Sequence, residues 1–451
     1  MNFHRKMIAS AVAVLAIGGS AINAQAATTI NGSGSTFMQN IVDVCASKYN
    51  SASANTNKDT VSYTGTGSGT GKTQFAAGTT KWGGSDSLYS SGAPADLVYV
   101  PLVAGPVAIS YRIDGILPAG TSLKLSSTTI AKIFAGQITK WNDAAIKADN
   151  KLAPVKAISL LNGKAKATIV KSGKTVKITV TLNSAIVKGN KITVDRSTNS
   201  KVKKGVKKVN VSRTITTFTV PYVAHSAYII KLKKSTIGAL SIDNIPVILP
   251  STSIIVAHRS DNSGTSNVFT SYLNAVSPTI WTKSGNDSFT TAFPGTRPSD
   301  GSFQAATGSD GVTNYVKDHN GAIGYAEVSY VDERAAEGSK ISAADVRNAS
   351  GAYVQPTSAG AAAFFAAATV GSNGVVTRNF ATKSATAYPI SAIAYGLAHA
   401  TTSTEATAVK AWFTYVLNTC APKYAEAFSY SALSGAAKMA ALAQVAKISA
   451  S

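Results

Sequence analysis

The segment from Arg259 to Thr265 has the residue types and the spacing needed to bind an anion. It follows an apolar run, 254–256, that predicts a strand, and it precedes apolar residues at helical spacing that stop before Pro278. The first backbone N–H groups of a helix are unpaired and lie at the positive end of the helix dipole. We therefore predict an oxyanion cradle formed by Ser263, Gly264 and Thr265, with the planar cation of Arg259 beside it.

Two further Gly/Ser segments precede predicted helices. Residues 32–36 follow a short predicted strand and lead into a helix patterned on Phe37, Ile41 and Cys45. Residues 65–71 follow a strand at 61–63 and lead into a second helix. A single segment of this kind is more often an ordinary helix cap, but three in one chain favour a tetrahedral anion held by amides and hydroxyls.

The second of these segments nearly matches the phosphate-binding loop of nucleotide-binding proteins. Thr66 stands where that motif requires its first glycine. An exported protein also meets little ATP, so we exclude a nucleoside triphosphatase.

Asp86 lies shortly after the second segment, and a carboxylate beside an anion site needs an explanation. A carboxylate accepts hydrogen bonds, which suits a ligand that still carries a proton. Hydrogen phosphate carries such a proton near neutral pH, whereas sulfate does not. The alternative is that Asp86 only caps a helix or a turn.

The N-terminus predicts an exported protein. Arg5 and Lys6 precede an apolar run, 7–17, and small residues at Ala24 and Ala26 form a cleavage site, so residues 1–26 are predicted to be a signal peptide. No cysteine follows the apolar run, so we expect no lipobox, and no later stretch is long and apolar enough to span a membrane. We expect a periplasmic or secreted protein.

The chain has two cysteines, Cys45 and Cys420. An even pair in an exported protein predicts a disulfide, which would tie the N-terminal region to the C-terminal one. Two buried thiols are the alternative.

The net charge of +22 is concentrated in one region. Residues 151–234 contain 19 Lys and Arg and one acid, Asp195, so they carry +18 of that charge. Short β-branched runs separated by turn residues predict a small all-β domain over residues 152–245 with its lysines facing solvent. The lysines could form a solvated surface that resists aggregation, or they could bind an anionic cell-surface polymer. The region has few aromatic residues on which bases could stack, which argues against specific nucleic-acid binding.

Outside this region the pattern is α/β. Residues 107–111 and 322–325 predict strands, and residues 127–134 predict a short helix before Gly136. The C-terminal part has helical periodicity around Trp412 and over 436–445.

Several motifs together resemble the periplasmic phosphate-binding proteins of the high-affinity phosphate ABC transporter, a PstS-like family of solute-binding proteins. They cover most of the chain outside the basic region. The matching segments are 32–37, 63–68, 84–86, 133–143, 259–265, 269–273, 310–311 and 321–325.

The resemblance implies a set of phosphate ligands and a supporting residue. Asp86 would accept the proton of the phosphate, and Asp261 would hold the Arg259 guanidinium in place. The sequence departs from the family at Ser33, Ser35 and Met38, where Ala, Ala and Pro are usual, and at Gly69, where Ser is usual. The implied phosphate-binding residues are Ser35, Thr36, Ser68, Asp86, Arg259, Ser263, Gly264 and Thr265.

The resemblance also implies the fold, an α/β two-lobed periplasmic-binding-protein fold of the type II, Venus-flytrap kind, into which the small all-β domain is inserted. Lobe I would comprise 27–108 and 389–451, and lobe II 109–151 and 246–388. Both cysteines would then lie in lobe I.

The function implied is capture of inorganic phosphate in the interlobe cleft and delivery to a membrane ABC permease. We expect a monomer that is not an enzyme and needs no cofactor or metal. The five histidines have no metal-ligand spacing, and His258 is expected to point away from the site. The alternatives are an exported phosphatase on the same scaffold and a cell-surface adhesin that uses the basic domain.

Overall fold

The computed structural model describes most of the chain after the N-terminal segment. The described residues are 27–115, 122–152, 156–160, 165–183, 190–198, 201–211, 213–233, 235–241, 245–246, 249–366 and 368–448. The predicted signal peptide, residues 1–26, lies outside them. No helix among the described residues is long and apolar enough to cross a bilayer.

A large mixed sheet runs through the body of the molecule. Its main path is β17 (Phe303–Ala306), β16 (Ile255–Arg259), β18 (Ala322–Glu327), β4 (Leu97–Tyr111), β22 (Ser391–His399), β3 (Trp82–Ser85), β1 (Thr29–Gly34) and β2 (Thr60–Gly65). Two short strands, β19 (Ser342–Ala343) and β23 (Ser431–Ala432), also pair with β4.

The long strand β4 joins the two lobes. Residues 97–106 pair with β22, and residues 107–111 pair with β18, so β4 changes partner between Pro106 and Val107. We call the part around β1, β2, β3 and β22 the first lobe, and the part around β16, β17 and β18 the second lobe. The residue limits given above for lobes I and II stay a prediction.

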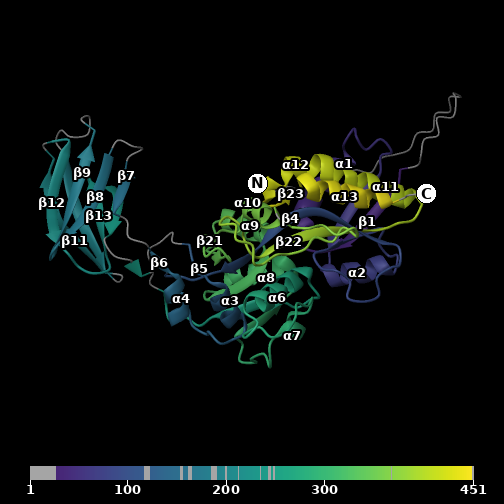
Figure 1. Cartoon of the computed structure of the whole chain (residues 1–451), viewed down its shortest axis with the longest axis horizontal. Helices are drawn as coiled ribbons and strands as arrows, with labels where there is room; N and C mark the ends of the chain where they lie inside the picture. The colour runs from purple at the N-terminus through teal and green to yellow at the C-terminus, as the bar shows by residue number, and fades with distance from the viewer. Residues whose placement is uncertain are drawn as a thin grey trace, which may run out of the picture.

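Helices cover the sheet in both lobes (Figure 1). The first lobe carries α1 (Gln39–Asn50), α2 (Ser68–Ala76), α11 (Thr404–Tyr415), a π-helical turn (Val416–Cys420), α12 (Ala421–Tyr424), a 3-10 turn (Glu426–Phe428) and α13 (Gly435–Lys447). The second lobe carries α3 (Ser127–Phe134), α4 (Ala144–Asp149), α6 (Gly264–Val276), α7 (Phe289–Ala292), α8 (Gly308–Asp318) and α9 (Val328–Ala336). Helix α10 (Ser358–Phe365) packs on β4, and β5 (Lys124–Leu125), β20 (Asp345–Arg347) and β21 (Tyr353–Val354) form a small sheet.

The predicted helices and strands outside the basic region are confirmed. Helix α3 has the bounds expected from the apolar spacing, and its N-cap Ser126 accepts a hydrogen bond from the Thr129 N–H. The strand expected at 322–325 continues to Glu327, and the C-terminal periodicity corresponds to α11 and α13.

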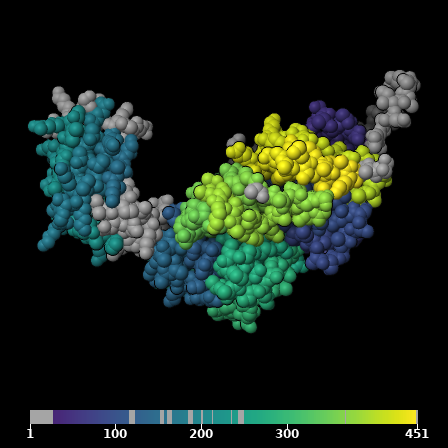
Figure 2. All heavy atoms as spheres, viewed as in Figure 1, coloured from purple at the N-terminus to yellow at the C-terminus, as the bar shows by residue number. Residues whose placement is uncertain are grey.

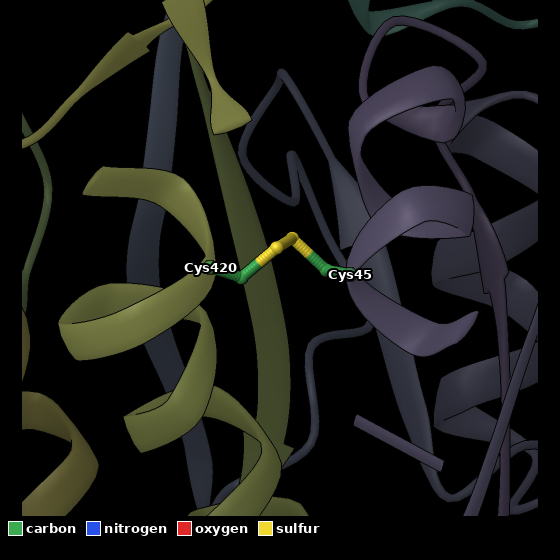
Figure 3. Close-up of a disulfide and its surroundings, with 2 residues drawn as sticks. All are labelled: Cys45 and Cys420. Carbon is green, nitrogen blue, oxygen red and sulfur yellow. A yellow bond between two sulfur atoms is a disulfide. The ribbon is translucent and has the colours of Figure 1, made fainter. Parts of the chain in front are cut away.

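A disulfide joins the two ends of the described chain. Cys45 in α1 is bonded to Cys420, at the end of the π-helical turn, across 375 residues of sequence (Figure 3). Both cysteines are buried in the main hydrophobic core, which also contains Tyr49 and Trp412 with ring centroids 5.4 Å apart. The alternative of two buried thiols is therefore wrong.

The basic region forms a β sandwich that stands apart from the body (Figures 1 and 2). One sheet is β12 (Ile215–Pro221), β9 (Thr175–Leu182), β8 (Ala165–Ser172) and β7 (Ala157–Leu160); the other is β11 (Lys201–Asn210), β10 (Lys191–Thr198), β13 (Ser226–Leu232) and β14 (Ser235–Ser241). Buried apolar side chains between the sheets, such as Ile178, Val194 and Ile230, form a core separate from that of the body. Strands β6 (Lys151–Leu152) and β15 (Ile245–Pro246) pair where the chain leaves and re-enters the body.

Candidate functional site

Asp86 lies where three of the predicted segments meet. It follows β3 and is 4% exposed. Its Oδ1 accepts a hydrogen bond from the Ser35 hydroxyl, and its Oδ2 accepts one from Thr265 Oγ1 at 3.1 Å. Its backbone N–H donates to Ser68 Oγ at 3.3 Å. Residues from both lobes therefore converge on one buried carboxylate.

Burial controls the charge of Asp86. Desolvation raises its pKa from the ordinary value of 3.8 to about 6, against the lowering effect of the hydrogen bonds from Ser35 and Thr265 and of the Arg259 charge. The nearby charge of Asp287 adds to the upward shift. Asp86 is thus a carboxylate at neutral pH, and it gains its proton in mildly acidic solution.

The N-terminus of α6 contacts the first lobe at close range. Ser263 is the N-cap, and its side chain accepts a hydrogen bond from the Ser266 N–H at 3.2 Å. A side chain at Gly264 would collide with the first lobe, because its Cβ would lie 2.5 Å from Ser68 Oγ and 2.9 Å from Asp86 Cβ. The absence of a side chain at position 264 is what lets the helix terminus approach Asp86.

Arg259 is held in one orientation by Asp261. The Arg259 Nε lies 2.7 Å from Asp261 Oδ1, and Nη2 pairs with Oδ2, which is the bidentate arrangement of a guanidinium and a carboxylate. Burial would raise the pKa of Asp261, but the hydrogen bonds and charge of Arg259 lower it below the usual range. The Gly308 N–H, at the start of α8, donates to the same carboxylate at 3.1 Å.

The hydroxyl of Thr36 bonds to Ser309 rather than to Asp86. Its Oγ1 is 3.0 Å from Ser309 Oγ and accepts the Ser309 N–H at 3.2 Å, so it joins the first lobe to the start of α8. Ser309 was missed by the sequence analysis. The signal was present, since Thr307 and Gly308 are the N-cap and the first residue of α8, as Ser263 and Gly264 are of α6.

The glycines of the first segment have a different role from the one expected. Strand β1 continues to Gly34, so residues 32–34 belong to the sheet and only the following residues turn. A Cβ at Gly32 would lie 2.1 Å from the Trp82 ring, and one at Gly34 would lie 2.0 Å from the Gly84 carbonyl oxygen. The absence of side chains at these two positions therefore permits close packing of β1 against β3.

An ion pair across the lobes was also missed. Lys72 Nζ lies 2.8 Å from Asp287 Oδ2 in the second lobe, and it donates to Ser87 Oγ and to the Leu88 carbonyl in its own lobe. The pair lines a cavity of about 670 Å³ between the two lobes, together with Asn262 and Gly69. Lys72 belongs to the segment that resembles a nucleotide-binding loop, and its contact is with a carboxylate instead.

The described residues contain no group of three or more His, Cys, Asp or Glu side chains that could hold a metal ion. His258 stacks on Phe289 with ring centroids 4.6 Å apart, and its Nδ1 lies 3.0 Å from the Arg259 carbonyl oxygen. Burial lowers the pKa of His258. These contacts hold its ring in the second-lobe core.

The sequence matches the family model described as a PBP superfamily domain over residues 19–210 and 211–419. The chain belongs to the PBP superfamily. The two matched ranges together cover most of its length, and their boundary falls within the β sandwich at the end of β11.

Two relatives of this PBP-superfamily chain are named as phosphate-binding proteins. It is 25% identical over 330 residues to the phosphate-binding protein PstS of Xylella fastidiosa, a match that covers 73% of this chain and 60% of the relative. It is 35% identical over 133 residues to the phosphate-binding protein PstS 3 of Mycobacterium tuberculosis, which covers 27% of this chain and 34% of the relative. The chain thus spans about 60% of the length of the first of these curated relatives.

A solved structure has the same fold as this PBP-superfamily protein. It is a high-affinity periplasmic phosphate-binding protein bound with phosphate, with a TM-score of 0.55 and 19% identity over 91% of this chain and 92% of that chain. The similarity shows that the two-lobed fold is shared.

Proposed function

We propose that this protein captures hydrogen phosphate between its two lobes. The observation that carries the proposal is the position of Asp86, a buried carboxylate that accepts hydrogen bonds from Ser35 in its own lobe and from Thr265 in the other. A carboxylate among hydroxyl donors and a fixed guanidinium suits an anion that is also a proton donor. The names of the relatives and of the solved structure support the same ligand.

The remaining ligands are assigned by the chemistry of the donors. Ser35, Ser68 and Thr265 offer hydroxyls, and the first amides of α6, at Gly264 and Thr265, offer N–H groups at the positive end of the helix dipole. Arg259 supplies the charge, and Asp261 fixes its plane. Thr36 and Ser263 contribute through the turns that they hold, since the Thr36 hydroxyl binds Ser309 and the Ser263 hydroxyl caps α6.

Closure of the lobes completes the binding site. Water leaves the cleft as the lobes meet, and charge-assisted hydrogen bonds are stronger in the drier environment. The closed form is what an ABC permease would recognise, and it would act as a monomer exported to the periplasm or secreted after cleavage near Ala27. The proposal contains no chemical step, so the protein would be a binding protein and not an enzyme.

Anion titration of residues 27–451 tests this proposal. Isothermal titration with inorganic phosphate near pH 7.5 should show saturable binding to one site, and sodium sulfate at equal ionic strength should bind much more weakly. Absence of phosphate binding by a folded sample, or equal affinity for both anions, would overturn it.

A further inference from the structure

Strand β11, an edge strand, contains more lysines than any other described strand of the β sandwich. β11 lies at the edge of its sheet, and five exposed lysines lie on it. The other three edge strands, β14, β12 and β7, contain no lysine or arginine. The five lysines are Lys201, Lys203, Lys204, Lys207 and Lys208.

Protection against edge-to-edge pairing does not explain this distribution. Lysine on an exposed edge discourages aggregation, but β12 and β14, with seven residues each, have none, so an edge of ten residues does not by itself call for five. Of the four edge strands, only β11 contains lysines. The concentration of charge on one strand indicates a partner for that strand.

Little of the charge of β11 is compensated within the described part of the sandwich, where, of the lysines of this strand, only Lys204 interacts electrostatically with the carboxylate of Asp195. None of its five lysines lies within ion-pair distance of a carboxylate among the residues described above. Asp195, the one acid between residues 151 and 234, is paired with Lys231 at 2.5 Å and accepts the Gly205 N–H at 2.7 Å. The strip is therefore a source of positive potential.

The geometry of β11 suits a narrow chain better than a flat surface. Neighbouring side chains of a strand point to opposite faces, so the pairs Lys203–Lys204 and Lys207–Lys208 flank the edge on both sides. A register shift between Val194 and Arg196 faces Gly205, whose φ is 61°, and such a bulge increases the local twist. A twisted edge of ten residues, about 30 Å long, can follow one extended polyanion along its length.

We propose that β11 is a docking strip for a linear phosphate polymer. Recognition rests on charge, because β11 contains no aromatic residue on which a base could stack. The strip belongs to the inserted domain and would act independently of the cleft around Asp86.

The test uses the whole mature chain with the cleft saturated by inorganic phosphate. The probe is fluorescently labelled long-chain inorganic polyphosphate, and affinity is measured by anisotropy over a range of salt concentrations. The strip variant replaces Lys203, Lys204, Lys207 and Lys208 by Gln. The control variant makes the same charge change at four exposed lysines on the other sheet and its hairpin, Lys166, Lys171, Lys174 and Lys177.

The strip variant should lose at least about tenfold in affinity, and the control variant less than about threefold. Counterion release from a single phosphate chain contributes roughly 0.7 to the salt slope per contact, so the slope of the strip variant should fall by about 3. A Lys→Arg version of the strip should retain binding. An unchanged far-UV circular dichroism spectrum and unchanged thermal unfolding would show that the sandwich of each variant is folded.

Three results would overturn the proposal: equal losses in the strip and control variants, absence of polyphosphate binding by the unmodified chain, or tighter binding of an oligothymidylate with the same number of phosphates. Strip-dependent binding to phosphatidylglycerol vesicles that exceeds binding to polyphosphate would show that the partner is a membrane and would equally contradict it.

Discussion

The hydroxyl of Thr265 in the second lobe donates a hydrogen bond to Asp86 in the first lobe, with 3.1 Å between Thr265 Oγ1 and Asp86 Oδ2. The contact joins residues 179 positions apart and lies at the N-terminus of α6. The proposed anion site therefore lies at the interface between the two lobes. Changes in the charge or hydrogen bonding of Asp86 should therefore alter both ligand affinity and closure.

Phosphate affinity should depend on the protonation of Asp86. Because burial raises the pKa of Asp86 to about 6, its carboxylate is ionised above that pH and loses its acceptor role below it. Affinity should fall as pH decreases through about 6, approaching tenfold for each further pH unit. Titration from about pH 8 to pH 5 measures this, and Asp86→Asn should lack the inflection that remains after correction for the ionisation of phosphate itself.

The Lys72–Asp287 pair should stabilise the closed form. It is partly buried, with side chains 10% and 17% exposed, so we expect a coupling energy of about 1 kcal/mol, or roughly fivefold in the dissociation constant. Lys72→Met and Asp287→Asn should each speed phosphate release in stopped-flow experiments, and the double variant should show their coupling.

The exposed pair Lys81–Glu405 is the matched control. It lies within the first lobe, with both side chains 42% exposed, so Lys81→Met should leave the release rate unchanged. Equal effects of Lys81→Met and Lys72→Met would refute a specific role for the cross-lobe pair.

Asp261 should act through Arg259. Removing one partner of a bidentate pair leaves the guanidinium less fixed, so Asp261→Asn should weaken phosphate binding by about 1–2 kcal/mol. Arg259→Lys should cost at least as much, because an ammonium cannot form the planar contact. Calorimetry of the two single variants and the double variant checks this; fully additive losses would show that Asp261 acts independently of Arg259.

The disulfide should stabilise the first lobe without affecting the ligand contacts. Replacing Cys45 and Cys420 by Ser should lower the free energy of unfolding by about 2–5 kcal/mol, because the bond closes a long loop in the unfolded chain. Urea unfolding measures the change. Phosphate affinity should be retained at low temperature, and unaltered stability would contradict the predicted role.

The local parts of the site were predictable from the sequence. The strand, the Ser/Gly turn and the helix at 254–276 are encoded in consecutive residues, and all three are present. The alternation of lysine with β-branched residues in the basic region likewise indicated a sandwich with lysines outside.

The contacts between segments could not be predicted in the same way. Thr36 and Ser309 are 273 residues apart, and Lys72 and Asp287 are 215 apart, so their pairing depends on how the lobes close. The packing role of the glycines at 32 and 34 could not be predicted either, because their neighbours, Trp82 and Gly84, lie in strand β3. A local sequence pattern does not show which distant residue will contact a given side chain.

The ratio of phosphate to sulfate affinity, measured by calorimetry at about pH 7.5 in the unmodified protein and in Asp86→Asn, tests the central claim most directly. If Asp86 accepts the phosphate proton, the unmodified protein should strongly prefer phosphate, and the variant should lose at least about tenfold of that preference, since a hydrogen bond to a charged group contributes about 1.5–3 kcal/mol. An unchanged ratio in a folded Asp86→Asn variant would contradict the account.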